Sequence, residues 1–157
     1  EVVNAGIPTL GICYGHQLIG DCLGGTVGVN PAGREIGISV VTQNGEDPIF
    51  EGLPRSFPVI QTHVDAVLEP PSVGTIIASN ENTENQAMAI GKRTRTVQWH
   101  PEFDVDIIGH YITVRAEAID SEFGPGHASH LLKSLKPVST GRLIMRNFLH
   151  DFAAGKV

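Results

Sequence analysis

The fold is decided by Ile7-Pro8-Thr9-Leu10-Gly11-Ile12-Cys13-Tyr14-Gly15-His16-Gln17, where the sequence changes its periodicity. Up to Ile12 the run is short, apolar and rich in β-branched residues, which is typical of a strand buried on both faces. After His16 apolar residues recur at helical intervals, and Gly24-Gly25 can end that helix. Cys13 is therefore predicted to lie at a turn from strand to helix.

This turn has the pattern of a nucleophile elbow. Gly11 and Gly15 flank Cys13 at two positions on either side, where we expect the chain to pass too close to its neighbours for a Cβ. The amides at the start of the next helix favour the negative charge of a thiolate, and the Tyr14 amide is a candidate oxyanion-hole donor. The alternative is that Cys13 is a small buried hydrophobe. Cys22 falls among helical apolar positions and is expected in the core.

Trp99-His100-Pro101-Glu102 supplies a candidate base and a group to orient it. A nucleophilic cysteine needs an imidazole within hydrogen-bond reach, and that imidazole needs a partner that fixes its tautomer. In an extended segment His100 and Glu102 point to the same side, and Pro101 favours the extended conformation at His100. A structural histidine at a strand end is the alternative. Together with the elbow, the pattern predicts a triad of Cys13, His100 and Glu102.

Between these motifs, short β-rich runs alternate with turns, and helical periodicity follows. A helix is expected from Asp104 toward Ser121, and a last helix through 143–152, with Ser139 or Thr140 as its N-cap. The strands are expected at 26–29, 36–42, 57–67, 74–79 and 87–103.

The composition limits the class of protein. A chain of 157 residues, 41% hydrophobic and 18% charged, suits a single domain over 1–157. A net charge of −6 without a basic stripe argues against nucleic-acid binding. With two cysteines, no signal-like start and no long apolar run, we expect a reduced, cytoplasmic protein that is not in a membrane. His127 and His130 lack a nearby third ligand, so no metal site is expected. No cofactor is expected either.

Two segments resemble the signatures of class I glutamine amidotransferases: Gly11–Leu18 and Gln98–Glu102. Arg34-Glu35-Ile36-Gly37 and Gln61-Thr62-His63-Val64-Asp65 are similar to motifs of the stand-alone branch related to the amidotransferase domain of guanosine monophosphate synthetase. The resemblance covers about residues 6 to 103 and becomes loose in the last third. It implies a flavodoxin-like, three-layer α/β sandwich with a mostly parallel central sheet, and a thioester intermediate formed from L-glutamine.

The resemblance also implies roles for further residues. Gln17 would contact the bound glutamine, and His63 and Asp65 would lie near its site. A structural hydrogen-bonded pair beneath the pocket is the alternative for His63 and Asp65. The family's fold begins with strands, a helix and a glycine-rich loop that gives a second oxyanion donor, and nothing in this sequence corresponds to them. The chain is therefore expected to be an N-terminally truncated fragment.

Three functions remain open. The first is a glutaminase that feeds ammonia to a synthetase partner or acts alone on glutamine. The second keeps the triad and hydrolyses γ-glutamyl peptides, because attack on a γ-amide tolerates different leaving amines. The third is a non-catalytic regulatory or interaction module. The intact Cys13, His100 and Glu102 weigh against the third, and the missing N-terminal part weighs for it.

Overall fold

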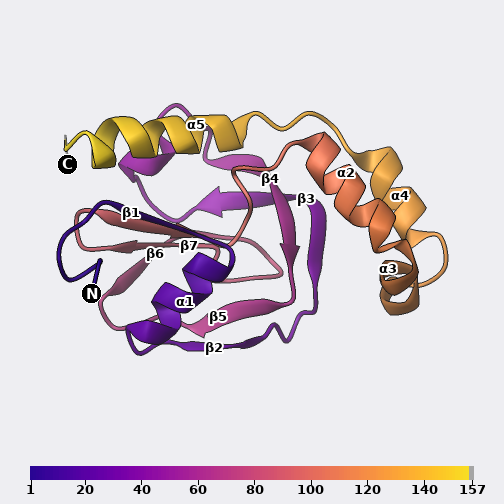
Figure 1. The fold of residues 1–157 in the computed structure, drawn as a ribbon, viewed down its shortest axis with the longest axis horizontal. Coiled ribbons are helices and arrows are strands. Elements are labelled where there is room, and N and C mark those ends of the chain that lie inside the picture. The colour runs from indigo at the N-terminus through magenta and orange to yellow at the C-terminus, as the bar shows by residue number, and fades with distance from the viewer. Residues whose placement is uncertain (156–157) are drawn as a thin grey trace.

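The computed structural model describes residues 1–155, which form a six-stranded sheet, a two-stranded sheet and flanking helices (Figure 1). This confirms the expected α/β class. The elements in chain order are β1 (Thr9–Ile12), α1 (Tyr14–Cys22), β2 (Thr26–Val29), β3 (Glu35–Gln43), the 3-10 turn η1 (Pro48–Phe50), β4 (Ser56–His63), β5 (Asp65–Glu69), β6 (Gly74–Ser79), β7 (Ala87–Ile90), β8 (Thr94–Val97), α2 (Val105–Val114), α3 (Ala116–Phe123), α4 (His127–Ser134), α5 (Thr140–Asn147) and the π-helical turn η2 (Phe148–Ala153).

The large sheet is mixed, with strand order β1-β8-β7-β6-β3-β4. Within residues 1–155, β1 and β8 form its one parallel pair, and the other four neighbouring pairs are antiparallel. The expectation of a mostly parallel sheet is therefore wrong for the described chain. Parallel neighbours need a long crossover connection, whereas β7 and β8 are joined by a tight turn at Gly91, where φ is 55°.

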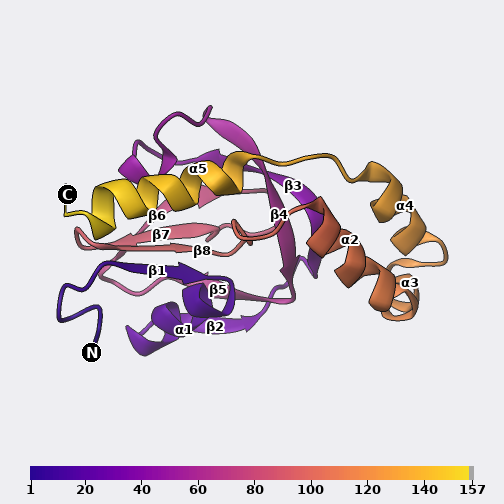
Figure 2. The same cartoon turned by 45° about the horizontal axis from the view of Figure 1, so that its top comes forward.

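Helices cover both faces of this sheet, which gives three layers (Figures 1 and 2). On one face α1 lies over the two-stranded sheet of β2 and β5 and over β7, where Gly20 closely approaches Val67 and Met88. On the opposite face Ile144 of α5 and Phe152 of η2 pack in the main core with Ala87, Val97 and Trp99. The side chains of β7 alternate between the two faces, as the pleat requires.

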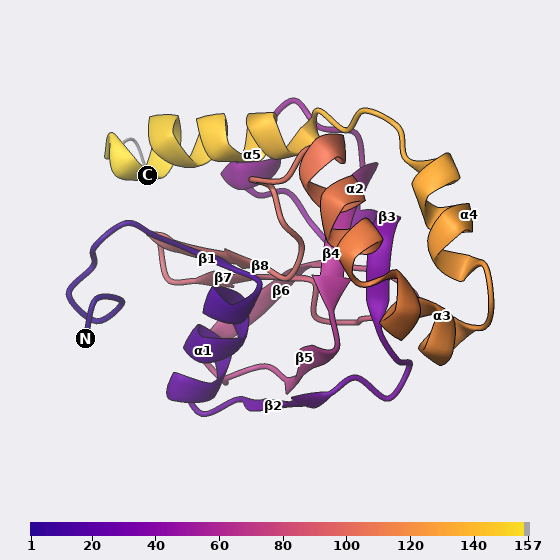
Figure 3. The same cartoon turned by 45° about the vertical axis from the view of Figure 1, so that its right-hand side comes forward.

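Helices α2, α3 and α4 form an arm beyond β3 and β4, far from α1 (Figure 3). Ile60 of β4 contributes to their apolar cluster, together with Ile108, Ile112 and Ile119. The predicted helix from Asp104 toward Ser121 is two helices, because the chain breaks at Arg115 and Ile119 folds back onto the same cluster. Within residues 1–155, no helix has both the length and the apolar character needed to cross a bilayer.

The predicted strand over 57–67 is likewise two strands. β4 pairs with β3 in the large sheet, whereas β5 pairs with β2 in the small one. The split falls at Val64, whose carbonyl oxygen accepts a hydrogen bond from the Asn30 amide. The polar motif Gln61-Thr62-His63-Val64-Asp65 therefore lies where the chain passes from one sheet to the other.

Candidate active site

Cys13 lies at the turn between β1 and α1, as predicted. Its φ of 46° and ψ of −101° make it the one non-glycine residue with positive φ among residues 1–155. The amide of Cys13 donates to the Val97 carbonyl at 2.9 Å, which ties the turn to β8. A strained residue at the start of a helix is the geometry of a nucleophile elbow.

The two flanking glycines differ. A Cβ on Gly11 would lie 2.8 Å from Ile19 Cδ1 and 2.9 Å from the Gly15 carbonyl oxygen, so only glycine fits there. A Cβ on Gly15 would meet no atom within 4 Å, and the clash expected at Gly15 is therefore wrong. The Gly15 carbonyl is one of the groups that Gly11 approaches, a role that the backbone of any residue could fill.

His100 and Glu102 form the predicted pair beyond the end of β8. His100 Nδ1 lies 2.7 Å from Glu102 Oε1, which leaves Nε2 for Cys13. The His100 amide donates to the Ile60 carbonyl at 2.9 Å, and its ring stacks on Phe103 with centroids 4.2 Å apart. The imidazole is thus held by a carboxylate, a neighbouring strand and an aromatic ring.

The electrostatics of His100 depend on both of its partners. Burial alone lowers the pKa of the imidazole, but hydrogen bonding to Cys13 and Glu102 and their negative charges outweigh this and raise the pKa to about 9. His100 is therefore an imidazolium at neutral pH. Such a group can donate a proton to a leaving amine.

Tyr14 and Gln17 lie on the first turn of α1. Tyr14 is its first residue, where a backbone N–H has no acceptor within the helix, and its side chain is 71% exposed. Gln17 is buried, and its Nε2 donates to the Asp65 carbonyl at 2.7 Å and to Gln98 Oε1 at 3.2 Å. The oxyanion role of Tyr14 remains a prediction. Contact between Gln17 and glutamine would have to use its amide oxygen.

His63 lies in a buried polar cluster. Its Nδ1 is 3.0 Å from the Asp65 carbonyl oxygen, and its Nε2 is 3.1 Å from Glu35 Oε2. Both ring nitrogens are engaged by the protein, so for His63 the geometry favours the structural alternative over substrate contact. Asp65 takes part through its backbone carbonyl, while the residue is exposed.

The carboxylate of Glu35 is the centre of that cluster. Asn80, Thr83 and Gln86 donate to it at 2.6, 2.8 and 2.7 Å. Burial alone raises the pKa of Glu35, but hydrogen bonds from His63, Thr83 and Asn80 outweigh it, and the pKa is lowered. Glu35 is therefore a buried, ionised carboxylate whose oxygens are hydrogen-bonded by protein side chains.

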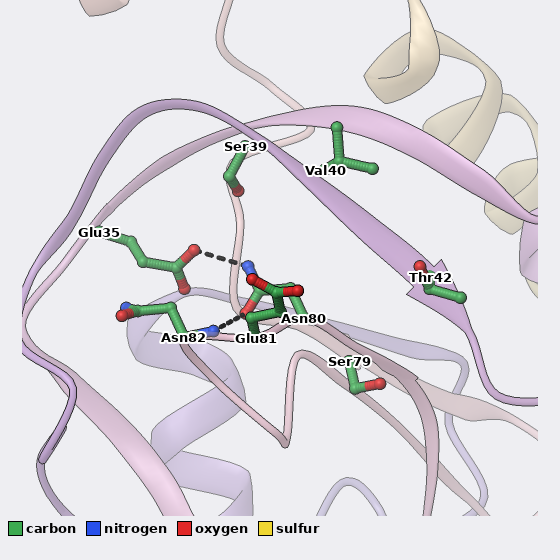
Figure 4. A pocket seen from close by; sticks show the side chains of 8 residues that line it. All are labelled: Glu35, Ser39, Val40, Thr42, Ser79, Asn80, Glu81 and Asn82. Atoms are coloured by element: carbon green, nitrogen blue, oxygen red, sulfur yellow. Dashed lines mark hydrogen bonds between the residues drawn. The ribbon is translucent and has the colours of Figure 1, made fainter.

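On its other side, Glu35 borders a hollow of about 630 Å³ between β3 and the segment after β6 (Figure 4). Asn80 bridges the hollow's rim to Glu35 (Figure 4). The triad residues are absent from its lining, so this hollow is separate from the elbow. The lining residues are Glu35, Ser39, Val40, Thr42, Ser79, Asn80, Glu81 and Asn82.

Sequence reasoning gave no role to Gln98, which the structure places beside the nucleophile. Gln98 is fully buried and its Nε2 lies 3.7 Å from Cys13 Sγ. The available signal was alternation, because Gln98, His100 and Glu102 share one side of an extended segment.

Cys22 is exposed, so its expected place in the core is wrong. The inward face of α1 is instead formed by His16, Gln17 and Gly20. His127 stacks on Phe123 with ring centroids 4.7 Å apart. Among residues 1–155, no group of three His, Cys, Asp or Glu side chains could hold a metal ion.

Comparison with known proteins identifies related chains. The family model for glutamine amidotransferase class-I matches residues 1–115. The glutamine-hydrolysing GMP synthase of Aeropyrum pernix is 43% identical over 101 residues, which are 64% of this chain and 20% of that protein. Gamma-glutamyl peptidase 3 of Arabidopsis thaliana is 27% identical over 154 residues, which are 93% of this chain and 60% of that protein.

Among solved structures, a glutamine amidotransferase from Thermotoga maritima aligns with a TM-score of 0.77 at 25% identity. The alignment covers 97% of this chain and 65% of that one. This chain therefore spans about a fifth of the GMP synthase and less than two thirds of the other two proteins.

Proposed function

Because the chain belongs to the class-I glutamine amidotransferase family, we propose that Cys13, His100 and Glu102 hydrolyse the side-chain amide of L-glutamine to glutamate and ammonia. The observation that carries the proposal is the state of His100. It is paired with Glu102 at 2.7 Å, and against the lowering effect of burial its hydrogen bonds to Cys13 and Glu102 raise its pKa to about 9. A strained cysteine facing an oriented imidazolium is an activated nucleophile with its acid in place.

The first half of the reaction forms a thioester. The Cys13 thiolate attacks the carboxamide carbon, and the carbonyl π electrons move to oxygen, where the Tyr14 amide donates a hydrogen bond. The C–N bond then breaks, and its electron pair takes the proton from His100 Nε2. Ammonia leaves, and the acyl group stays on Sγ.

The second half releases glutamate. His100, now neutral, takes a proton from water, and the resulting hydroxide attacks the thioester carbon. The C–S bond breaks, and its electron pair returns to Sγ. Glu102 stays charged throughout and stabilises the imidazolium each time it forms. Every step is a proton transfer or an acyl transfer, so the mechanism requires no cofactor.

The ammonia either escapes or passes to a synthetase. The name of the Aeropyrum relative joins glutamine hydrolysis to GMP synthesis, and this chain matches only a fifth of that protein. We infer that the acceptor is activated by a synthetase partner or domain beyond the matched segment. The described residues carry the hydrolytic half of such a reaction.

A second candidate is hydrolysis of γ-glutamyl peptides by the same triad. The similarity to gamma-glutamyl peptidase 3 extends over 93% of the chain, whereas the similarity to the GMP synthase covers 64%. Attack on a γ-amide follows the same steps, except that His100 protonates an amino-acid amine in place of ammonia. The residues that bind the leaving group would decide between the two substrates.

The test is product release from each substrate in parallel. Ammonia from L-glutamine and cysteinylglycine from γ-glutamyl-cysteinylglycine would be measured for the chain alone and mixed with candidate synthetases, with Cys13→Ser as the control. Ammonia release that is lost in Cys13→Ser is the expected result. Cleavage of the peptide alone would favour the second candidate, and turnover of neither substrate would overturn both and leave a non-catalytic module.

A further inference from the structure

Gln98 is the group that comes closest to Cys13 from the protein interior. Its Nε2 lies 3.7 Å from Sγ, its Oε1 accepts from Gln17 Nε2 at 3.2 Å, and its backbone amide donates to the Gln86 carbonyl at 2.8 Å. Gln98 has no exposed surface. The side chain is therefore held at both ends of its amide and cannot turn away into solvent.

The direction of this amide follows from a backbone carbonyl. The two ends of a glutamine amide have similar shapes but opposite hydrogen-bonding roles. The Asp65 carbonyl can only accept, so the end of Gln17 that faces it at 2.7 Å must be the NH₂ group. The NH₂ group of Gln17 also donates to Gln98, so the end of the Gln98 amide that faces Gln17 must be the oxygen Oε1. The other end of that amide, its NH₂ group, therefore faces Cys13 Sγ.

The Asp65 carbonyl is itself fixed by the buried pair of His63 and Glu35. His63 Nδ1 faces this carbonyl at 3.0 Å, and His63 Nε2 faces Glu35 Oε2 at 3.1 Å. The His63 ring therefore links the Glu35 carboxylate to the Asp65 carbonyl. A continuous line of hydrogen bonds thus runs from Glu35 through His63, the Asp65 carbonyl, Gln17 and Gln98 to the sulfur.

We propose that Gln98 is a further catalytic residue that stabilises negative charge on Cys13 Sγ, and that Gln17, His63 and Glu35 are positioning residues that keep its N–H turned to the sulfur. The proposal rests on the function proposed above. The sulfur carries charge before it attacks and again when the C–S bond of the thioester breaks. A hydrogen bond to sulfur is stronger at those two points than in the neutral thioester, so it favours formation of the nucleophile and departure of the thiolate.

The test measures the reactivity of the thiol without any substrate. The rate at which iodoacetamide alkylates Cys13 would be followed from pH 6 to pH 10 in a Cys22→Ser background, because Cys22 is exposed and would react as well. In Gln98→Met, which keeps the length and loses the donor, we expect the rate at pH 6 to fall about threefold to tenfold. The rate at pH 10, where the thiolate forms anyway, should change by less than about twofold.

Two further variants test the direction of the hydrogen bond to sulfur and the positioning role of Glu35. Gln98→Glu places an acceptor against the sulfur and should reduce the rate at pH 6 more than Gln98→Met does. Glu35→Gln lies far from the sulfur and should give a smaller reduction in the same direction, and an unchanged rate would overturn the positioning part of the proposal.

Gln61→Met is the matched control. Gln61 is as fully buried as Gln98, and its Nε2 donates to Gln86 Oε1 at 2.9 Å instead of reaching the elbow. The rate of Cys13 alkylation in Gln61→Met should match that of the parent at every pH from 6 to 10. Parental reactivity in Gln98→Met, or an equal loss in Gln61→Met, would overturn the proposal. Because alkylation needs no glutamine, a positive result in a protein that does not hydrolyse glutamine would separate this inference from the proposed function.

Discussion

The backbone of Cys13 occupies a region that L-residues avoid, with φ at 46°. Such a conformation costs about 1–2 kcal/mol, and glycine does not incur this cost. We predict that Cys13→Gly is more stable than Cys13→Ala by about 1 kcal/mol, measured by urea unfolding. The comparison removes the thiol in both variants, so the difference reports the backbone alone.

Cys22 supplies the control, because it is exposed at the end of a regular helix. There the order should reverse, with the glycine variant less stable than the alanine variant by about 0.5 kcal/mol. If the alanine variant is at least as stable as the glycine variant at position 13 as well, Cys13 is not strained.

The pKa of His100 sets an alkaline limit on activity. With the pKa raised to about 9, the imidazolium that protonates the leaving group is lost as the pH rises through about 9. Ammonia release should therefore decline above pH 9. Any stability that His100 contributes has the same sign: it is fully present below pH 6.5 and lost as the pH rises through about 9.

Glu102→Gln tests this cause. Removing the carboxylate that lies 2.7 Å from Nδ1 should lower the pKa of His100 and move the alkaline decline down by about one pH unit. The pH profile of kcat/KM from pH 6 to 10 measures the shift. A decline at unchanged pH would assign the alkaline limit to another group.

For individual residues, the sequence was sufficient to predict positions that are set by local spacing. Cys13 at a strand-to-helix turn and the pairing of His100 with Glu102 both follow from a few neighbouring residues. The donor role of Gln98 could not be predicted, because its direction depends on a carbonyl contributed by Asp65. The exposure of Cys22 was missed since α1 buries a polar face, with His16 and Gln17, against the sheet.

Among the elements, α5 has a direct effect on the triad through Gly141. A Cβ at this position would collide with the Pro101 carbonyl oxygen and lie 2.8 Å from its carbonyl carbon. Pro101 stands between His100 and Glu102, so a side chain at position 141 would push either α5 or the triad segment out of place. We predict that Gly141→Ala destabilises the protein by about 1–3 kcal/mol and lowers the rate of ammonia release.

Gly109 of α2 is the matched control, because a Cβ there would make an ordinary contact of 3.4 Å with Leu135 Cδ1. Gly109→Ala should raise stability by about 0.5–1 kcal/mol through helix propensity, and leave ammonia release unchanged. Urea unfolding and the ammonia assay, run on both variants, would check the pair. Equal effects of the two substitutions would mean that α5 does not position Pro101.

The order of strands and helices along the chain was largely predictable, whereas their pairing was not. Alternation and turn residues locate β3 and β6, because these signals lie within each element. The break at Arg115 and the passage of β5 into the small sheet depend on which surface each segment buries. Such non-local choices leave no periodic trace in the sequence.

For the molecule as a whole, His16 joins three parts of the fold. From α1 its Nδ1 contacts the Thr96 hydroxyl of β8 at 2.8 Å, and its Nε2 contacts the Asn85 carbonyl at 3.0 Å. A neutral ring satisfies both, since Nε2–H donates to the carbonyl and Nδ1 accepts from the hydroxyl. Burial, and to a smaller extent the charge of His63, lowers the pKa of His16 to about 3 against a backbone hydrogen bond that raises it.

This buried histidine makes the stability of the molecule sensitive to mild acid. Because the folded pKa is depressed from 6.5, the contribution of His16 is fully present above pH 6.5 and is lost as the pH falls toward about 3. The unfolded chain then binds one more proton than the folded one, which costs about 1.4 kcal/mol per pH unit, or about 2 kcal/mol between pH 6.5 and 5.

The test is urea unfolding at pH 6.5 and at pH 5. The parent should show this loss of stability, and so should His110→Gln, where the replaced histidine is exposed. His16→Gln should lose about 2 kcal/mol less over the same interval, whatever its absolute stability, because a glutamine cannot titrate. A parental pH dependence in His16→Gln would show that the acid sensitivity of the fold arises elsewhere.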